Sequence, residues 1–185
     1  MALKIGILPI GQVDATVTLQ IQGNVGKIFP DTKCVLIDDH SFQLGKALDE
    51  KRKQYRSNVI LSEIQGYVAE KKDLNRVLGV VDADIFVPEL NFVFGEASCP
   101  GRTALISLWR LKPEFYGVSP NMELFLARAL KEAVHELGHT LGLRHCSRSS
   151  CVMYFSNSIF DTDRKQSLFC DQCYLQVALS INSLG

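Results

Sequence analysis

Apolar and polar stretches alternate along the first 80 residues in a way that predicts strands separated by helices. Residues 3–10 form a nearly continuous apolar run, which predicts a buried strand. Residues 13–29 place apolar side chains at helical spacing, and residues 32–37 predict a second strand. A second helix is expected over 57–74 and a third strand over 77–81. This alternation is typical of an α/β layer with parallel strand pairing.

The middle and the end of the chain have different patterns. Residues 90–94 and 103–109 are strand-like, and the intervening residues 95–101 contain a Cys-Pro-Gly turn signal. We therefore expect a hairpin that adds an antiparallel edge to the sheet. Beyond Gly142 there is little periodicity, and only residues 168–184 have the apolar spacing of a final helix.

The segment between Ser119-Pro120 and Gly142 predicts the clearest helix of the chain. Serine is a favoured N-cap, and proline suits the first helical turn, where its missing N–H would be unpaired anyway. Gly142 is a suitable stop, because glycine tolerates the left-handed conformation that follows a helix end. At 100° per residue one apolar stripe, less than about 110° wide, is formed by Leu126, Leu130, Ala133, Val134, Leu137 and Leu141.

Two histidines project from the opposite side of this helix. His135 and His139 lie one turn apart and point the same way, so they can bind one tetrahedral zinc ion. A turn at Gly142 would bring His145 back to the same metal and leave one position open for water. Glu136 would flank the metal without binding it, as the general base that acts on this water.

Composition excludes several classes of function. The chain has 185 residues, enough for one domain with a hydrophobic core. Twenty basic and 20 acidic residues give a formal net charge of zero, so nucleic acid and anionic membranes are not expected partners. No segment approaches the ~20 apolar residues of a membrane helix. Residues 1–10 lack the features of a signal peptide, so we expect a cytoplasmic protein with reduced cysteines.

The cysteines predict a second metal site. Four of the six form two pairs with Cys-x4-Cys and Cys-x2-Cys spacing: Cys146, Cys151, Cys170 and Cys173. Paired cysteines of this kind suit a tetrahedral thiolate site, so we expect a structural zinc ion that stabilises the C-terminal part. Two disulfides, or a redox-active Cys-x-x-Cys, are the rival interpretations. Cys34 is expected to be an inert core residue, and Cys99 a loop thiol.

The order of these residues resembles a known family. Residues 135–145 read His-Glu-Leu-Gly-His-Thr-Leu-Gly-Leu-Arg-His, which matches the extended zinc motif of the metzincin clan. The cysteine pairs and Met153 that follow this motif resemble the archaemetzincin branch of that clan. The matched motif covers residues 134–173, about a fifth of the chain.

The resemblance implies a fold and a division of the chain. It implies one metalloprotease domain of the α/β (α+β) class over 1–185, with a twisted mixed sheet, helices, and an active-site helix that ends at Gly142. An N-terminal subdomain would span 1–142, and a small cysteine-rich C-terminal subdomain would span 143–185. Met153 would form the Met-turn that supports the zinc ligands from below.

The resemblance also implies an activity. The expected function is a zinc-dependent peptidase with two zinc ions, one catalytic and one structural, which acts as a monomer on peptide or protein substrates. An extended peptide would pair with an edge strand, either 90–94 or, as we slightly favour, 103–109. Aminopeptidase-like action, known in the family, would require a carboxylate for the free amino end, and Glu96, Asp84 and Glu132 are candidates.

Two other functions fit the same residues. The chain could be a zinc-containing peptide-binding module with little or no proteolytic activity, although the presence of Glu136 argues against a complete loss of chemistry. It could also be a purely structural metalloprotein. The number of bound zinc ions, and the effect of replacing Glu136, distinguish these alternatives.

Overall fold

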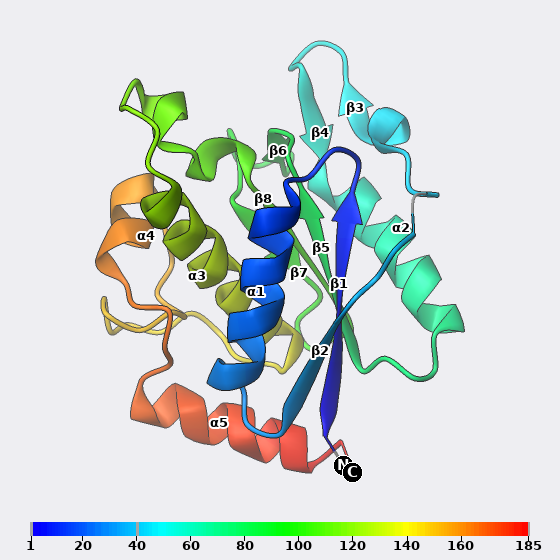
Figure 1. The fold of residues 1–185 in the computed structure, drawn as a ribbon, viewed down its shortest axis with the longest axis vertical. Helices are drawn as coiled ribbons and strands as arrows, with labels where there is room; N and C mark the ends of the chain where they lie inside the picture. Colours follow the sequence, from blue (N-terminus) through cyan, green and yellow to red (C-terminus); the bar gives the residue numbers. More distant parts are fainter. Residues whose placement is uncertain (1, 40, 185) are drawn as a thin grey trace.

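A five-stranded mixed sheet forms the centre of the molecule, with helices on both of its faces (Figure 1). The computed structural model describes residues 2–39 and 41–184. The strands in spatial order are β2 (Thr32–Leu36), β1 (Leu3–Ile10), β5 (Arg76–Val81), β8 (Thr103–Ser107) and β7 (Gly95–Ala97). The first four are parallel, and β7 is antiparallel to β8. A smaller sheet contains β3 (Leu48–Asp49), β4 (Gln54–Arg56) and β6 (Ile85–Phe86).

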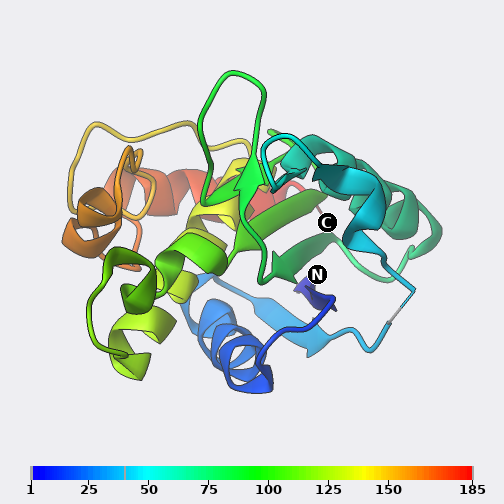
Figure 2. The same cartoon turned by 90° about the horizontal axis from the view of Figure 1, so that it is seen from above.

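The helices cover the central sheet unequally (Figure 2). They are α1 (Ala15–Ile28), α2 (Ser57–Glu70), α3 (Met122–Thr140), α4 (Ile159–Arg164) and α5 (Asp171–Asn182), with short 3-10 helices at Leu44–Ala47, Trp109–Leu111 and Pro113–Tyr116. Leu78 and Val80 of β5 join the apolar cluster of α1, α3 and α5, whereas Val77 and Val81 join that of α2. Because both faces of the strand are covered, β5 is buried along its whole length. The α/β class expected from the sequence is confirmed.

The hairpin is confirmed, but the strand predicted at 90–94 is wrong. This segment is irregular, and the antiparallel partner of β8 is β7, which the sequence placed in a loop. The apolar residues of 90–94 pack through their side chains. Phe94 is buried and packs edge to face on Phe92, with the two ring centroids 5.2 Å apart. The preference for 103–109 as the edge is also wrong. β8 lies between β5 and β7 and is fully buried, so β7 forms the edge.

The limits of α3 differ slightly from the prediction. The helix begins at Met122 and not at Ser119-Pro120, because Asn121 provides the cap: its Oδ1 accepts a hydrogen bond from the backbone N–H of Leu124 at 2.9 Å. It ends at Thr140, and Gly142 then turns the chain with a φ of +90°. Among the described residues, no helix has both the length and the apolar character needed to cross a membrane.

Candidate active site

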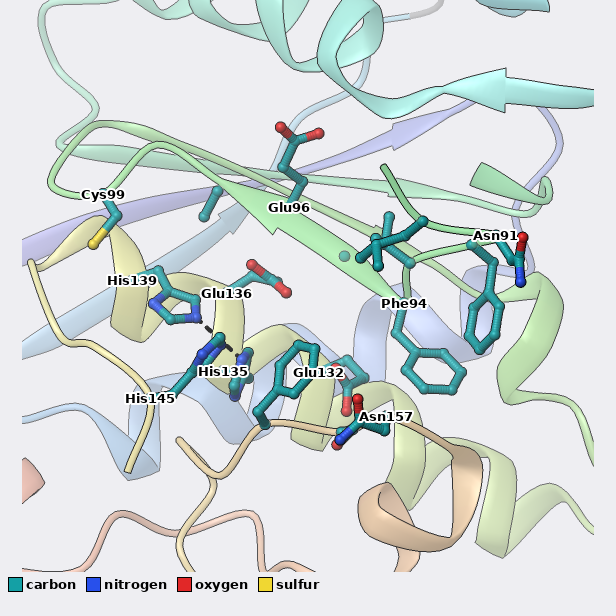
Figure 3. A pocket seen from close by; sticks show the side chains of 17 residues that line it. Asn91, Phe94, Glu96, Cys99, Glu132, His135, Glu136, His139, His145 and Asn157 are labelled. Carbon is teal, nitrogen blue, oxygen red and sulfur yellow. Dashed lines mark hydrogen bonds between the residues drawn. The ribbon is translucent and has the colours of Figure 1, made fainter. Parts of the chain in front are cut away.

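Three imidazoles converge beside the C-terminal half of α3 (Figure 3). His135 and His139 project from neighbouring turns of the helix, and His145 returns toward them after the turn at Gly142. The Nε2 atoms of His135 and His139 are 3.1 Å apart. One ring nitrogen from each of the three histidines lies within 4.8 Å of the others. The structure therefore brings together the three histidines that the sequence predicted.

Backbone carbonyls fix the orientation of two of these rings. Nδ1 of His135 is 2.8 Å from the carbonyl oxygen of Val152, and Nδ1 of His139 is 2.7 Å from that of Leu143. A ring that donates from Nδ1 to a carbonyl keeps the lone pair on Nε2, which is the form that binds a metal. Burial also lowers the pKa of both rings, that of His135 well below its usual range. Both effects favour the neutral, metal-binding imidazole.

The donor set fits a zinc ion. Two nitrogens bound at ~2.0–2.1 Å in tetrahedral geometry lie about 3.3 Å apart, close to the 3.1 Å between Nε2 of His135 and Nε2 of His139. A third imidazole from His145 leaves one position for water, as in catalytic zinc sites. All three histidines line the same pocket, so the open position is accessible to a substrate.

Glu136 lies next to the histidines and faces strand β7 across the pocket (Figure 3). Burial, followed by the nearby charge of Glu132, raises the pKa of this carboxyl group well above its usual range. The space for its side chain depends on Gly95 of β7. A Cβ at Gly95 would lie 2.6 Å from Cγ and 2.7 Å from Oε1 of Glu136. Sequence reasoning missed Gly95, because its importance depends on a residue distant in the chain.

The pocket has a volume of about 450 Å³. It runs between β7 and α3, and is closed by the irregular residues 90–94 and by the segment that follows Met153. Apart from the histidines and Glu136, the lining of the pocket includes Phe92, Phe94, Gly95, Glu96, Cys99, Glu132, Phe155 and Asn157. An edge strand beside a carboxylate and three imidazoles suits the binding of an extended peptide.

The three carboxylates considered for a free amino end have different environments. Glu96 lines the pocket, but its side chain points away from the histidines in Figure 3. Asp84 does not line the pocket and forms a bidentate ion pair with Arg110, with both distances 2.7 Å. Glu132 lines the pocket and pairs with the fully buried Lys165 at 2.9 Å. No sequence signal near Lys165 indicates this contact.

Met153 supports the helix that contains the histidines. It is fully buried and packs against Gly138, where an added Cβ would lie only 2.5 Å from its sulfur. Its carbonyl oxygen accepts a hydrogen bond from the N–H of Cys146 at 2.9 Å. The methionine thus contacts the helical turn between His135 and His139, the position that the sequence predicted for a supporting residue.

The four paired cysteines form a second cluster on the chain. Sγ atoms of Cys146, Cys151, Cys170 and Cys173 all lie within 4.8 Å of one another. The sulfurs of Cys146 and Cys170 are 3.9 Å apart, too far for a disulfide and close to the ~3.8 Å between two thiolates on one tetrahedral zinc ion. The cysteines are free in the structure, which does not support the disulfide interpretation.

Hydrogen bonds favour a thiolate at Cys170, whereas burial raises the pKa of Cys151 and Cys173. Burial acts to raise the pKa of Cys170, but hydrogen bonds from the backbone of Cys173 and from neighbouring thiols lower it to about 7. The N–H of Arg148 donates to Sγ of Cys146 at 3.4 Å, and the N–H of Cys170 donates to Sγ of Cys151 at 3.3 Å. Such donors stabilise the negative charge of metal-binding sulfurs.

Comparisons with known proteins identify relatives of this chain. The model of peptidase family M54 matches residues 21–178. The chain is 42% identical over 173 residues to the archaemetzincin of Methanocaldococcus jannaschii, covering 94% of this chain and 92% of that protein. The crystal structure of an archaemetzincin from Methanopyrus kandleri superposes with a TM-score of 0.85 at 33% identity, covering 98% of this chain and 96% of that one.

A second solved structure has a more distant sequence. The crystal structure of a zinc-dependent peptidase from Methanocorpusculum labreanum also gives a TM-score of 0.85, at 26% identity, and covers 94% of this chain and 99% of that one. The fold is thus shared by chains that differ at most positions.

Proposed function

Because the chain belongs to peptidase family M54, the archaemetzincin family of zinc metallopeptidases, we propose that it hydrolyses peptide bonds at the centre formed by His135, His139 and His145. The observation that best supports this site is the convergence of three imidazoles on one point, with the Glu136 carboxylate beside them in a pocket bordered by an edge strand. These residues are the ones expected from the motif.

Each residue of the site has a distinct role in this proposal. The three histidines hold the zinc ion, which when bound lowers the pKa of a water molecule to near 7 and polarises the substrate carbonyl. Glu136 accepts a proton from the attacking water and later delivers it to the leaving amine.

Strand β7 provides the surface for the substrate backbone. One side of β7 pairs with β8, and its three residues line the pocket beside Glu136. An extended peptide can pair with the remaining edge through backbone hydrogen bonds, which places a peptide bond next to the histidines. Gly95 keeps this part of the strand close to Glu136 without a clash.

The cysteine cluster holds a second, structural zinc ion in this proposal. Four thiolates fill a tetrahedral coordination shell, which leaves no position for water or substrate. The four cysteines also do not line the pocket beside the histidines. The expected content is therefore two zinc ions per chain, of which one takes part in chemistry.

Replacement of Glu136 by glutamine tests the activity. Glu136→Gln keeps the shape of the side chain but removes the base, so kcat/KM for a peptide library should fall by about 10²–10⁴-fold. The zinc content should stay at two. Glu123→Gln is the control, because Glu123 lies exposed in the first turn of α3 and does not line the pocket. Equal cleavage by wild type and Glu136→Gln would instead favour a peptide-binding module.

A further inference from the structure

The pocket is lined by Glu132 as well as by Glu136, which lies one turn later on α3 (Figure 3). Glu132 is only 3% exposed, although it lines the pocket. The hydroxyl of Thr162 donates to its Oε1 at 3.1 Å, and Nζ of Lys165 lies 2.9 Å from the same oxygen. The part of the pocket that Glu132 lines is therefore polar.

Lys165 lies behind this carboxylate and does not line the pocket. Its side chain is fully buried, with Nζ 3.5 Å from the carbonyl oxygen of Tyr154. The pair of Glu132 and Lys165 is thus electrically neutral as a unit. Among the described residues, the Thr162 hydroxyl and Nζ of Lys165 both contact Oε1 of Glu132, which leaves Oε2 to accept a hydrogen bond from a group in the pocket.

Other walls of the pocket are aromatic. Phe92 and Phe94 pack edge to face, with their ring centroids 5.2 Å apart. Phe155 also lines the pocket, and its ring centroid lies 4.8 Å from that of His145. Asn157 lies near Glu132 in Figure 3. Flat or long apolar groups fit between aromatic walls, whereas the part that Glu132 lines requires a polar partner.

We propose that Glu132, neutralised by Lys165, selects substrates whose side chain in this pocket is uncharged and ends in a hydrogen-bond donor, as in tyrosine or glutamine. This inference rests on the proposed function and specifies its substrate class. An apolar tip would leave Oε2 without a partner once water is displaced. A charged tip of either sign would lose its hydration in the pocket without a net opposite charge to pair with, because Lys165 already neutralises Glu132.

Peptide libraries test this preference directly. Peptides are varied at each residue that flanks the cleaved bond, with tyrosine, phenylalanine, glutamine, leucine, lysine and glutamate compared at one position. For the residue that enters the pocket, we expect kcat/KM for tyrosine to exceed that for phenylalanine by about tenfold or more. Lysine and glutamate should be the poorest residues at this position.

A double variant links the preference to the pair. Glu132→Leu together with Lys165→Met replaces the buried ion pair by apolar side chains, which avoids leaving one charge alone in the interior. The ratio of kcat/KM for tyrosine over phenylalanine should then fall to about one or below. Glu123→Gln is again the control and should keep the wild-type ratio.

A binding measurement gives an independent readout if the double variant does not fold. Calorimetry with the Glu136→Gln variant should show tighter binding of the tyrosine peptide than of the phenylalanine peptide. Equal use of phenylalanine and tyrosine by the wild type, a preference for lysine, or an unchanged ratio in the double variant would overturn the selectivity while proteolysis stands. Loss of the proposed function would appear differently, as equal cleavage by wild type and Glu136→Gln.

Discussion

The histidine cluster and the cysteine cluster are both suited to a zinc ion, but they are built differently. The histidines come from α3 and the turn that follows it, and two of the rings are oriented by backbone carbonyls. The cysteines come from irregular chain around Cys146 and Cys151 and from the start of α5. The first cluster opens into a pocket, whereas the second does not contribute to it. Rigidly held histidines that leave one coordination position open suit a catalytic zinc ion. Four sulfur ligands that fill the coordination shell suit a structural zinc ion.

The two clusters should depend on metal to different degrees. Val134 and Leu137 of α3 are buried in the main core, so the helix that presents His135 and His139 is held by packing. The chain between α3 and α4 has no regular hydrogen-bond ladder of its own. We therefore expect the histidine site to survive without zinc, and the cysteine segment to depend on it.

The largest effect is expected from Cys151→Ser. This change removes one of four ligands from a site whose metal binding contributes directly to folding, by ~10–16 kcal/mol in zinc-finger peptides. Zinc content should fall from two to one, and the melting temperature by about 10 °C or more. Cys34→Ser is the control: burial raises the pKa of Cys34 to about 11, so this thiol stays protonated, and two zinc ions should remain. Full zinc content with unchanged melting in Cys151→Ser would refute the thiolate site.

An intermediate effect on the fold is expected from His139→Ala. One zinc ion should again be lost, and peptide cleavage should fall to background, because the remaining imidazoles do not hold the metal in a catalytic geometry. The helix content by circular dichroism should stay the same, and the melting temperature should fall less than in Cys151→Ser. If limited proteolysis showed that the C-terminal segment becomes accessible in His139→Ala, the proposed independence of the two sites would be wrong.

The smallest effect is expected from Gly142→Ala. Gly142 has a φ of +90°, a conformation that costs an L-residue ~1–2 kcal/mol. For a chain of this size, that corresponds to a fall of about 2–8 °C in melting temperature. Zinc should also be held more weakly at the histidine site, since the turn positions His145. Gly23→Ala in α1 is the control, because an added Cβ there meets no atom within 4 Å. Equal melting temperatures for both variants would contradict the role of the turn.

The sequence predicted the parts of the molecule that depend on local spacing. Helical periodicity predicts α1, α2 and α3, and the position of His145 after Gly142 indicates the third imidazole. Parallel strands such as β5 were recognisable because strands covered on both faces are continuously apolar.

The parts that depend on distant contacts were missed. Residues 90–94 are apolar because they line the pocket and pack on each other, not because they form a strand. The role of Gly95 depends on Glu136 across the pocket, and the ion pair of Glu132 with Lys165 joins α3 to the chain after α4. No periodicity or motif describes such pairs.

The shortness of β7 limits how an enzyme of this shape can recognise a substrate. With three residues at ~3.3 Å each, the strand offers about 10 Å of backbone for pairing. A bound peptide therefore pairs with β7 over little more than the bond to be cut, and its distal residues extend into solvent. Discrimination between substrates must then come from one or two side chains beside that bond. Proteins of unrelated sequence can therefore be substrates wherever a suitable short stretch is unfolded.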